Sequence, residues 1–163
     1  MKNKLLDITE EERLASEVTK FEEGFRPAPY YDSLGYPSIG FGTWLGPKGT
    51  PLSYYTIRIS PTVGEGMVLG YCQEYVDLLS VRYAEEWKLC NPARRAILMS
   101  MFHQLGGAGI ANFKQMWKAI LAQDWNKASA EMKDSTWYKQ TTNRAERHMA
   151  VMRTGSISPS YNV

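Results

Sequence analysis

The chain has 163 residues, of which 44% are hydrophobic and 22% are charged, and its formal net charge at pH 7 is +2. These values are typical of one compact domain that buries roughly 70% of the surface exposed by its unfolded chain. The charge is too small to indicate nucleic acid as the partner, and no apolar run approaches the length of a membrane span. Met1–Asp7 carries two lysines without an apolar stretch, a pattern that does not predict a signal peptide.

Cys72 and Cys90 are the only cysteines of the chain. Their separation does not match the spacing of metal ligands, so the sequence predicts two reduced thiols in the core. We find no glycine-rich phosphate loop, no metal-binding cluster and no serine bracketed as in a hydrolase elbow. The sequence therefore indicates no metal and no cofactor.

The first predicted helix begins after Thr9, because Thr9–Glu12 has the pattern of a capping box. Apolar residues then recur every three or four positions and predict one buried stripe, formed by Leu14, Val18, Phe21 and Phe25. Gly24 and the prolines that follow it end the helix. This places Glu23 in the last helical turn.

The segment after this helix predicts extended structure. Residues 30–44 predict two short strands, with turn residues at 33–35 between them. Residues 46–51 are rich in glycine and proline and predict a loop, and residues 54–59 predict a further strand. A small hairpin is therefore expected directly after Glu23.

The rest of the chain predicts helices. Ser60–Pro61 and Asn91–Pro92 each join an N-cap residue to a proline suited to the first helical position. The first of these helices is expected to run to about residue 84. The second contains the apolar segment 96–102, which is typical of a buried central helix, and Gly106–Gly107 is expected to stop it. Shorter helices are expected at residues 113–122, 124–133 and 143–153, the last closed by Gly155.

Two carboxylates, Glu23 and Asp32, lie 32 − 23 = 9 residues apart in different settings. A helix end and a hairpin can face each other across a cleft, which is the arrangement that a hydrolase with two carboxylates needs. Taken alone, the pair favours the simpler interpretation of a helix-end charge beside a solvated turn aspartate. The residues around it change that balance.

The segment from Phe21 to Arg26, followed by Tyr30 to Gly42, resembles the catalytic signature of the phage-type lysozymes, glycoside hydrolase family 24. Further matching segments follow in the second half, at residues 102–106, 110–113, 137–145 and 153–155. The last two are similar to the T-even bacteriophage lysozymes in particular. Between residues 44 and 89 only the helical pattern is shared. Relative to the family, Met1–Asp7 is an extension whose role the sequence leaves open.

The resemblance implies a two-lobed, mostly helical α+β fold. A small N-terminal lobe with a β-hairpin would span about residues 13–60 and carry the catalytic residues. A connecting helix would span about residues 61–84, and a helical C-terminal lobe would span about residues 85–163.

The same resemblance implies that Glu23 is the catalytic acid, Asp32 the catalytic aspartate and Ser38 the hydroxyl that holds a water. The expected reaction is hydrolysis of the β-1,4 bond between N-acetylmuramic acid and N-acetylglucosamine in bacterial peptidoglycan, with inversion at the anomeric carbon. Inversion requires roughly 6.5–9.5 Å between the two carboxyl groups. Burial beside apolar groups would raise the pKa of Glu23, whereas pairing with Arg144 would lower it; the sequence leaves the outcome open.

Three further residues are candidates for substrate binding: Trp44, His103 and Gln104. Gln104 matches the family. Trp44 replaces a frequent leucine and either stacks on a sugar ring or anchors the hairpin. His103 replaces an aromatic residue and either faces the substrate or is a satisfied helix histidine. Thr43 stands where the family commonly has a histidine, which removes an ion pair from the small lobe.

The family implies an endolysin that causes host cell lysis, with peptidoglycan as partner, no nucleic acid partner and a monomeric state. Such an enzyme is made in the bacterial cytoplasm and needs a separate holin to reach the periplasm and wall. One basic group is either a wall-binding surface or an ordinary solvated helix face: Lys139, Arg144, Arg147, His148 and Arg153.

Three alternatives remain. A lytic transglycosylase on the same fold needs the glutamate but no water-activating aspartate, so Asp32 and Ser38 argue against it. A catalytically silent wall-binding module would not require Glu23, Asp32 and the hydroxyl together. The lysozyme lobe of a tail-puncturing machine is disfavoured, because nothing in the sequence resembles a trimerising or fibre segment.

Overall fold

The computed structural model describes residues 7–163, so the N-terminal extension lies outside the described residues except for Asp7. The fold is mostly helical with one small antiparallel sheet, which confirms the predicted α+β class. The helices are α1 (Glu10–Glu23), α2 (Pro61–Arg82), α3 (Ala84–Leu89), α4 (Pro92–Ala111), α5 (Lys114–Leu121), α6 (Trp125–Lys133), α7 (Thr136–Gln140) and α8 (Thr142–Thr154). The strands are β1 (Arg26–Tyr31), β2 (Pro37–Gly40) and β3 (Thr43–Trp44), and a 3-10 turn covers Leu52–Tyr54.

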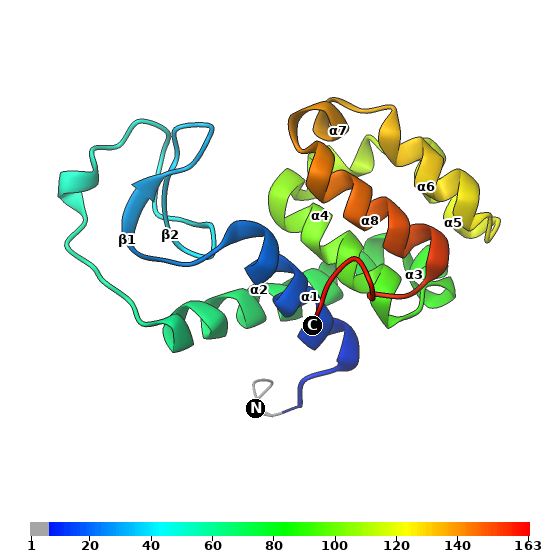
Figure 1. The fold of residues 1–163 in the computed structure, drawn as a ribbon, viewed down its shortest axis with the longest axis horizontal. Coiled ribbons are helices and arrows are strands. Elements are labelled where there is room, and N and C mark those ends of the chain that lie inside the picture. Colours follow the sequence, from blue (N-terminus) through cyan, green and yellow to red (C-terminus); the bar gives the residue numbers. More distant parts are fainter. Residues whose placement is uncertain (1–6) are drawn as a thin grey trace.

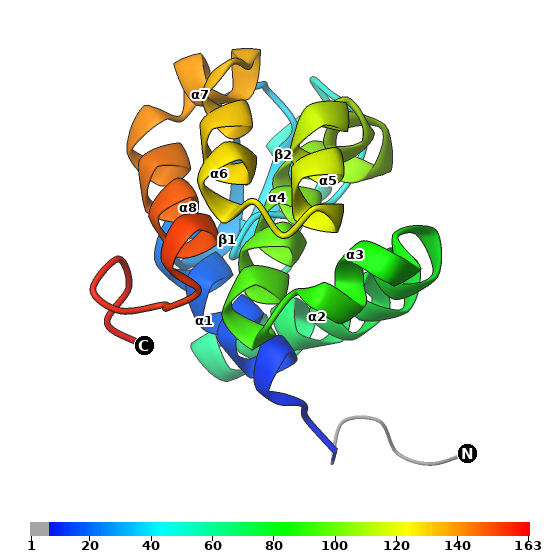
Figure 2. The same ribbon diagram turned by 90° about the vertical axis from the view of Figure 1, so that its right-hand side faces the viewer.

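The sheet and most of the helices lie at opposite ends of the molecule (Figure 1). Helix α2 runs between these ends, and α1 lies beside it and leads directly into β1. Seen from the helical end, α4 passes through the middle of the other helices (Figure 2). In the part of the chain that the structure describes, none of the helices is both long and apolar enough to cross a membrane.

Helix α1 begins and ends as predicted. The Thr9 hydroxyl accepts a hydrogen bond from the Glu12 backbone, and the Glu12 carboxylate accepts one from the Thr9 backbone. Glu23 is the last helical residue, followed by Gly24 with φ +65°. The predicted stripe is wrong at Phe21, whose side chain is 56% exposed. Phe21 lies beyond the buried face of α1 and packs edge-on against Tyr161.

The hairpin contains three strands where the sequence predicted two. Strand β2 pairs with β1 through Tyr30 and Ser38, and with β3 through Ser38 and Trp44. The chain reverses between β2 and β3 at Gly40 and Gly42, whose φ angles are +65° and +82°. Positive φ is accessible to glycine without strain, so this tight reversal depends on both glycines.

The strand predicted at residues 54–59 is wrong. A 3-10 turn is followed by irregular chain up to Ser60. Tyr54 is 76% exposed and Ile57 is 47% exposed, so their apolar side chains do not mark a buried face. Ile59 donates a backbone hydrogen bond to Pro27, which fastens this segment to the start of β1 without forming a ladder.

The two cap-and-proline pairs start α2 and α4 as predicted. Helix α2 ends at Arg82 and is followed by α3, which was not predicted. Gly106 breaks the helical geometry of α4 with φ +67° and ψ 179°, but the helix resumes and continues to Ala111. The predicted stop is therefore a kink, because Gly106 takes up the irregular geometry and the residues after it return to helical angles.

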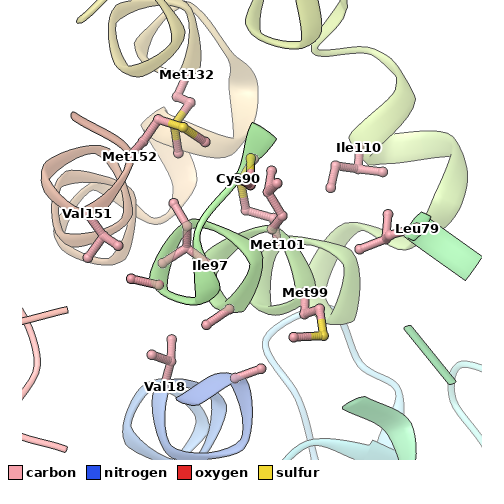
Figure 3. Packing of buried hydrophobic residues seen from close by; sticks show 14 of the residues in the cluster. Val18, Leu79, Cys90, Ile97, Met99, Met101, Ile110, Met132, Val151 and Met152 are labelled. Atoms are coloured by element: carbon pink, nitrogen blue, oxygen red, sulfur yellow. The ribbon is translucent and has the colours of Figure 1, made fainter. Parts of the chain in front are cut away.

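The core surrounds α4. Its Ile97, Met99 and Met101 are fully buried and leave the helix on different sides toward its neighbours (Figure 3). Cys72 and Cys90 belong to the same core as free thiols, as predicted. Burial raises the pKa of the Cys72 thiol to about 12 and that of Cys90 to about 11, so both remain protonated at neutral pH.

Candidate active-site cleft

One cleft brings together the candidate residues from the helix end, the hairpin and α4. A pocket of about 130 Å³ lies where these three parts of the chain meet. Its lining includes both carboxylates and all but one of the other sequence candidates, namely Glu23, Asp32, Ser38, Trp44, His103 and Gln104. A larger cavity of about 610 Å³ lies among α4, α5, α6 and α7, but none of these six residues lines it. Its chemistry rather than its size makes the smaller cleft the candidate site.

Arg144, the remaining candidate, holds Glu23 from behind. Its Nη1 donates to Glu23 Oε1 at 2.7 Å. Its Nη2 donates to the hydroxyl of Ser100 at 3.0 Å and to the Ser100 carbonyl at 3.3 Å. The arginine is 7% exposed, so this charge lies inside the protein and is balanced by the glutamate. The ion pair fixes one oxygen of Glu23.

The second oxygen of Glu23 faces the hairpin. A Cβ atom placed on Gly42 would lie 3.2 Å from Glu23 Oε2 and 3.4 Å from its Cδ. Gly42 therefore meets two requirements, the positive φ of the reversal and the close approach to the carboxylate. The tip between β2 and β3 thus packs directly on Glu23.

Asp32 is held by the turn that it starts. Its Oδ1 accepts hydrogen bonds from the backbone of Leu34 at 2.9 Å and of Tyr36 at 2.8 Å. This is the local pattern by which aspartate stabilises a turn. The Oδ2 atom takes no part in these bonds. Asp32 lines the cleft and is partly exposed. Its Oδ1 therefore stabilises the turn, while its Oδ2 can accept a proton or a hydrogen bond from a ligand.

Ser38 lies on the central strand between Tyr30 and Trp44, and its residue surface is fully buried. Its hydroxyl donates to the Tyr36 carbonyl at 3.3 Å. A serine hydroxyl has one proton and two acceptor positions, so the oxygen can still accept a hydrogen bond. Ser38 also lines the cleft.

His103 is both satisfied by the protein and part of the cleft. Its Nδ1 lies 2.9 Å from the Tyr75 hydroxyl, and its ring also hydrogen-bonds the Phe41 backbone. Burial lowers the pKa of His103, and the nearby Glu23 carboxylate opposes that change in part. His103 is therefore neutral at neutral pH and connects α4 to α2 and to the hairpin.

Trp44 and Gln104 occupy opposite walls of the cleft. Trp44 is 60% exposed, and one face of its indole stacks on Tyr36 with ring centres 4.5 Å apart. Gln104 Oε1 accepts a hydrogen bond from Trp137 Nε1 at 2.7 Å, a partner that the sequence did not predict. The cleft continues past both residues into a groove of about 340 Å³ that adds Tyr71, Tyr75 and Phe102.

The five basic residues, for which the sequence left a wall-binding surface or a solvated helix face open, do not form one exposed face. His148 is fully buried, Arg144 is 7% exposed, and Arg147 donates to Glu22 from Nε at 2.8 Å and from Nη2 at 2.7 Å. Lys139 and Arg153 are exposed. A count of positive residues could not separate these cases, because the carboxylates that pair with both arginines lie on α1, more than 120 positions away.

Residues 7–163 hold no group of three His, Cys, Asp or Glu side chains that could bind a metal ion. The chemistry that the described cleft offers is that of two carboxylates on different elements, a neutral histidine, hydroxyl and amide groups, and an exposed indole. Such a set suits acid–base chemistry on a polar ligand that also presents a flat apolar face.

Comparison with known proteins gives relatives over most of the chain, although no family model matches it. The pre-baseplate central spike protein Gp5 of Enterobacteria phage T4 is 31% identical over 166 residues, which cover 91% of this chain and 29% of the spike protein. Probable T4-type lysozyme 1 of Dictyostelium discoideum is 26% identical over 87% of this chain and 95% of its own length. Peptidoglycan hydrolase gp36 of Pseudomonas phage phiKMV is 29% identical over 88% of this chain and 15% of the hydrolase.

The chain thus spans less than a third of the two phage proteins and nearly the whole of the Dictyostelium lysozyme. Its cleft also contains the signature by which the sequence resembles the phage-type lysozymes. Taken together, these similarities support a phage T4-type lysozyme-like protein.

Proposed function

We propose that this protein is a lysozyme that hydrolyses the β-1,4 bond between N-acetylmuramic acid and N-acetylglucosamine in bacterial peptidoglycan. One observation carries the proposal: Glu23 and Asp32, from a helix end and a hairpin turn, line the same cleft together with the Ser38 hydroxyl. The relatives named as T4-type lysozyme and peptidoglycan hydrolase support it. The proposal includes the division into a small hairpin lobe, a connecting helix and a helical lobe.

In the proposed mechanism Glu23 protonates the oxygen that leaves the sugar. Because Oε1 accepts a hydrogen bond from Arg144, the proton resides on Oε2, the oxygen beside Gly42. As the proton moves to the leaving oxygen, the bond between that oxygen and the anomeric carbon breaks. Glu23 is left as a carboxylate, which its arginine partner stabilises.

Asp32 and Ser38 provide the other half of the reaction. Asp32 uses its free oxygen to accept a proton from a water that Ser38 orients, and the water oxygen bonds to the anomeric carbon. A single displacement of this kind inverts the anomeric centre. Glu23 has then lost one proton to the leaving oxygen, and Asp32 has gained one from the water. The enzyme returns to its starting state when these two residues exchange protons with solvent.

The substrate groove supplies contacts of two kinds. The exposed indole of Trp44 offers a flat face for the apolar side of a pyranose ring. Gln104 and His103 offer polar groups on the opposite wall. The wider role is that of an endolysin: a monomer, made in the host cytoplasm, that reaches the wall after a separate holin opens the inner membrane.

A second role for the same chemistry is local opening of the wall at the start of infection. The similarity to a central spike protein, and the small share of both phage relatives that the chain covers, favour this candidate. Probing purified virions and late-stage cell lysates with an antibody against the protein separates the roles. A spike component is found in virions, whereas an endolysin is found free in the lysate.

The experiment that tests the activity is digestion of purified peptidoglycan by wild type and by Glu23→Gln, with the fragments identified by mass spectrometry. We expect free reducing ends with wild type only. Fragments lighter by one water would indicate a transglycosylase. Wall binding without cleavage by the wild type would indicate a silent module.

A further inference from the structure

Glu22, the residue before Glu23, is held as firmly as the candidate acid itself. Its side chain is 4% exposed. Oε1 accepts from Arg147 Nε at 2.8 Å and from the Tyr161 hydroxyl, and Oε2 accepts from Arg147 Nη2 at 2.7 Å. A carboxylate with three donors, two of them in a bidentate guanidinium, is oriented without freedom to rotate.

Helix α8 supplies the arginines for both glutamates. Arg144 and Arg147 are three positions apart and lie on one face of α8, from which they pair with the consecutive Glu23 and Glu22. Helix α1 packs mainly on α4 and α2, so these two ion pairs are its main link to α8. The last turn of α1 is therefore fixed from the side by charged side chains.

Tyr161 completes this arrangement from the C-terminal segment, which returns to lie against α1 (Figure 1). The residue is 1% exposed, and its hydroxyl lies 2.8 Å from His148 Nδ1 as well as on Glu22. A phenol has one proton, which is donated to the carboxylate, so its oxygen accepts from His148. His148 is then the Nδ1–H tautomer, and burial lowers its pKa well below the ordinary value, which keeps it neutral.

The same contacts reach a second residue of the cleft, Gln104. His148 packs edge-on against Trp137 with ring centres 5.9 Å apart, and Trp137 donates to Gln104. On the other side, the Arg147 guanidinium lies 5.9 Å from the Tyr161 ring centre and 5.3 Å from that of Phe21. Tyr161 thus lies at the centre of a buried network that touches α1, α8 and, through Trp137, the cleft residue Gln104.

We propose that Tyr161 is a positioning residue, which acts through Glu22 to hold the carboxylate of Glu23 in its productive orientation. The proposal rests on the proposed function. Glu23 is the last residue of α1, and Gly24 after it donates a backbone hydrogen bond to Lys20, so the Glu23 backbone belongs to the last turn of this helix. Arg144 holds the end of the Glu23 side chain, and the helical turn that Glu22, Arg147 and Tyr161 fix holds its backbone. Loss of alignment lowers the rate of the chemical step rather than the affinity for substrate.

The test compares Tyr161→Phe with Ser129→Ala, using soluble uncrosslinked peptidoglycan strands as substrate. Tyr161→Phe keeps the ring and removes one buried hydroxyl. Ser129→Ala also removes one buried hydroxyl that bonds α8, since Ser129 Oγ donates to the Met149 carbonyl at 2.9 Å, but this bond lies away from α1. We expect Tyr161→Phe to lower kcat about tenfold and leave KM within about twofold, and Ser129→Ala to keep the wild-type kcat.

A Tyr161→Phe protein with wild-type kcat, or an equal fall of kcat in both variants, would overturn the proposal. If Tyr161→Phe does not fold, Arg147→Lys decides the matter, because it keeps the charge and loses the bidentate grip on Glu22. It is expected to show the same fall in kcat at unchanged KM. A wild-type protein that cleaves no strand would overturn the proposed function itself, and this proposal with it.

Discussion

Asp32 and Glu23 line the same cleft, but the structure holds them in different ways. The hydrogen-bond donors to Asp32 lie two and four positions along the chain, within one turn. The arginines that hold Glu23 and its neighbour Glu22 lie 121 and 125 positions away on α8. We call the side of the cleft that carries Asp32 and Ser38 the hairpin wall, and the side that carries Glu23 the helix wall. The hairpin wall is therefore a local structure, whereas the helix wall forms only when the C-terminal helices are packed.

This difference has a consequence for robustness. A turn stabilised by nearby backbone groups keeps its shape when distant packing loosens. A carboxylate fixed through buried ion pairs depends on the packing of the whole helical part. We expect disturbances of α8 to affect Glu23 first and the Asp32 turn last.

The largest effect is expected from Arg144→Met. Removing one member of an ion pair that is mostly buried leaves Glu23 uncompensated and costs about 3 kcal/mol of unfolding free energy. Turnover should fall at least about a hundredfold, because the acid loses its orientation. Urea denaturation and strand hydrolysis measure the two effects. Lys139→Met, at an exposed position, is the control and should match the wild type in both.

Ser38→Ala should separate activity from stability on the hairpin wall. The hydroxyl makes one long bond to Tyr36, so the unfolding free energy should change by less than about 1 kcal/mol. Turnover should fall about a hundredfold, because the water loses its partner. The control is Ser53→Ala, at an exposed serine outside the cleft. An unchanged rate in Ser38→Ala would remove this residue from the mechanism.

The buried histidine of α8 should make the stability of the protein depend on pH. Burial lowers the pKa of His148 well below its ordinary value of 6.5, so the unfolded chain binds a proton at this residue before the folded protein does. Stability is therefore complete above about pH 6.5 and is lost as pH falls below it, by up to about 1.4 kcal/mol per pH unit.

Urea denaturation of wild type and His148→Gln between pH 7 and pH 5 measures this dependence. The variant should lose less stability over the range, while His103, whose pKa burial also lowers, keeps part of the slope. If the unfolding free energies of the two proteins fall in parallel with pH, His148 does not contribute to the pH dependence of stability.

The smallest effect is expected from Trp44→Ala. Its indole is exposed, so the loss of its stacking on Tyr36 should cost about 0.5–1 kcal/mol of stability. KM should rise about fivefold at constant kcat if the ring binds ground state and transition state alike. Steady-state kinetics on soluble strands measure both constants. A fall in kcat at unchanged KM would mean that Trp44 takes part in the chemical step.

The same contrast explains how much the sequence could predict. Caps and turns depend on neighbouring residues, so the starts of α1, α2 and α4, the end of α1 at Glu23 and the Asp32 turn were all predictable. The six candidate residues that line the cleft were implied by a family resemblance that covers both halves of the chain.

What the sequence could not predict depends on distant partners or on very short elements. Helices α3 and α7 have six and five residues, too few to show a period. Strand β3 has two residues and exists because Gly40 and Gly42 return the chain to β2. The hydrogen bond from Tyr161 to Glu22 joins positions 139 residues apart, and the burial of His148 depends on the tertiary packing around α8. The sequence offered one signal for these contacts. Arg144 and Arg147 lie about one helical turn apart, a spacing that allows them to pair with two adjacent glutamates.

In the mechanism that we propose, Glu23 gives a proton while Asp32 and Ser38 direct a water to the opposite face of the sugar. Proton NMR of the first product released from soluble peptidoglycan strands tests it most directly, because it reads the anomeric configuration before mutarotation. We predict the α-anomer, formed by a single inverting displacement. A first product in the β configuration would contradict it and would make Asp32 a nucleophile or assign the water to another residue.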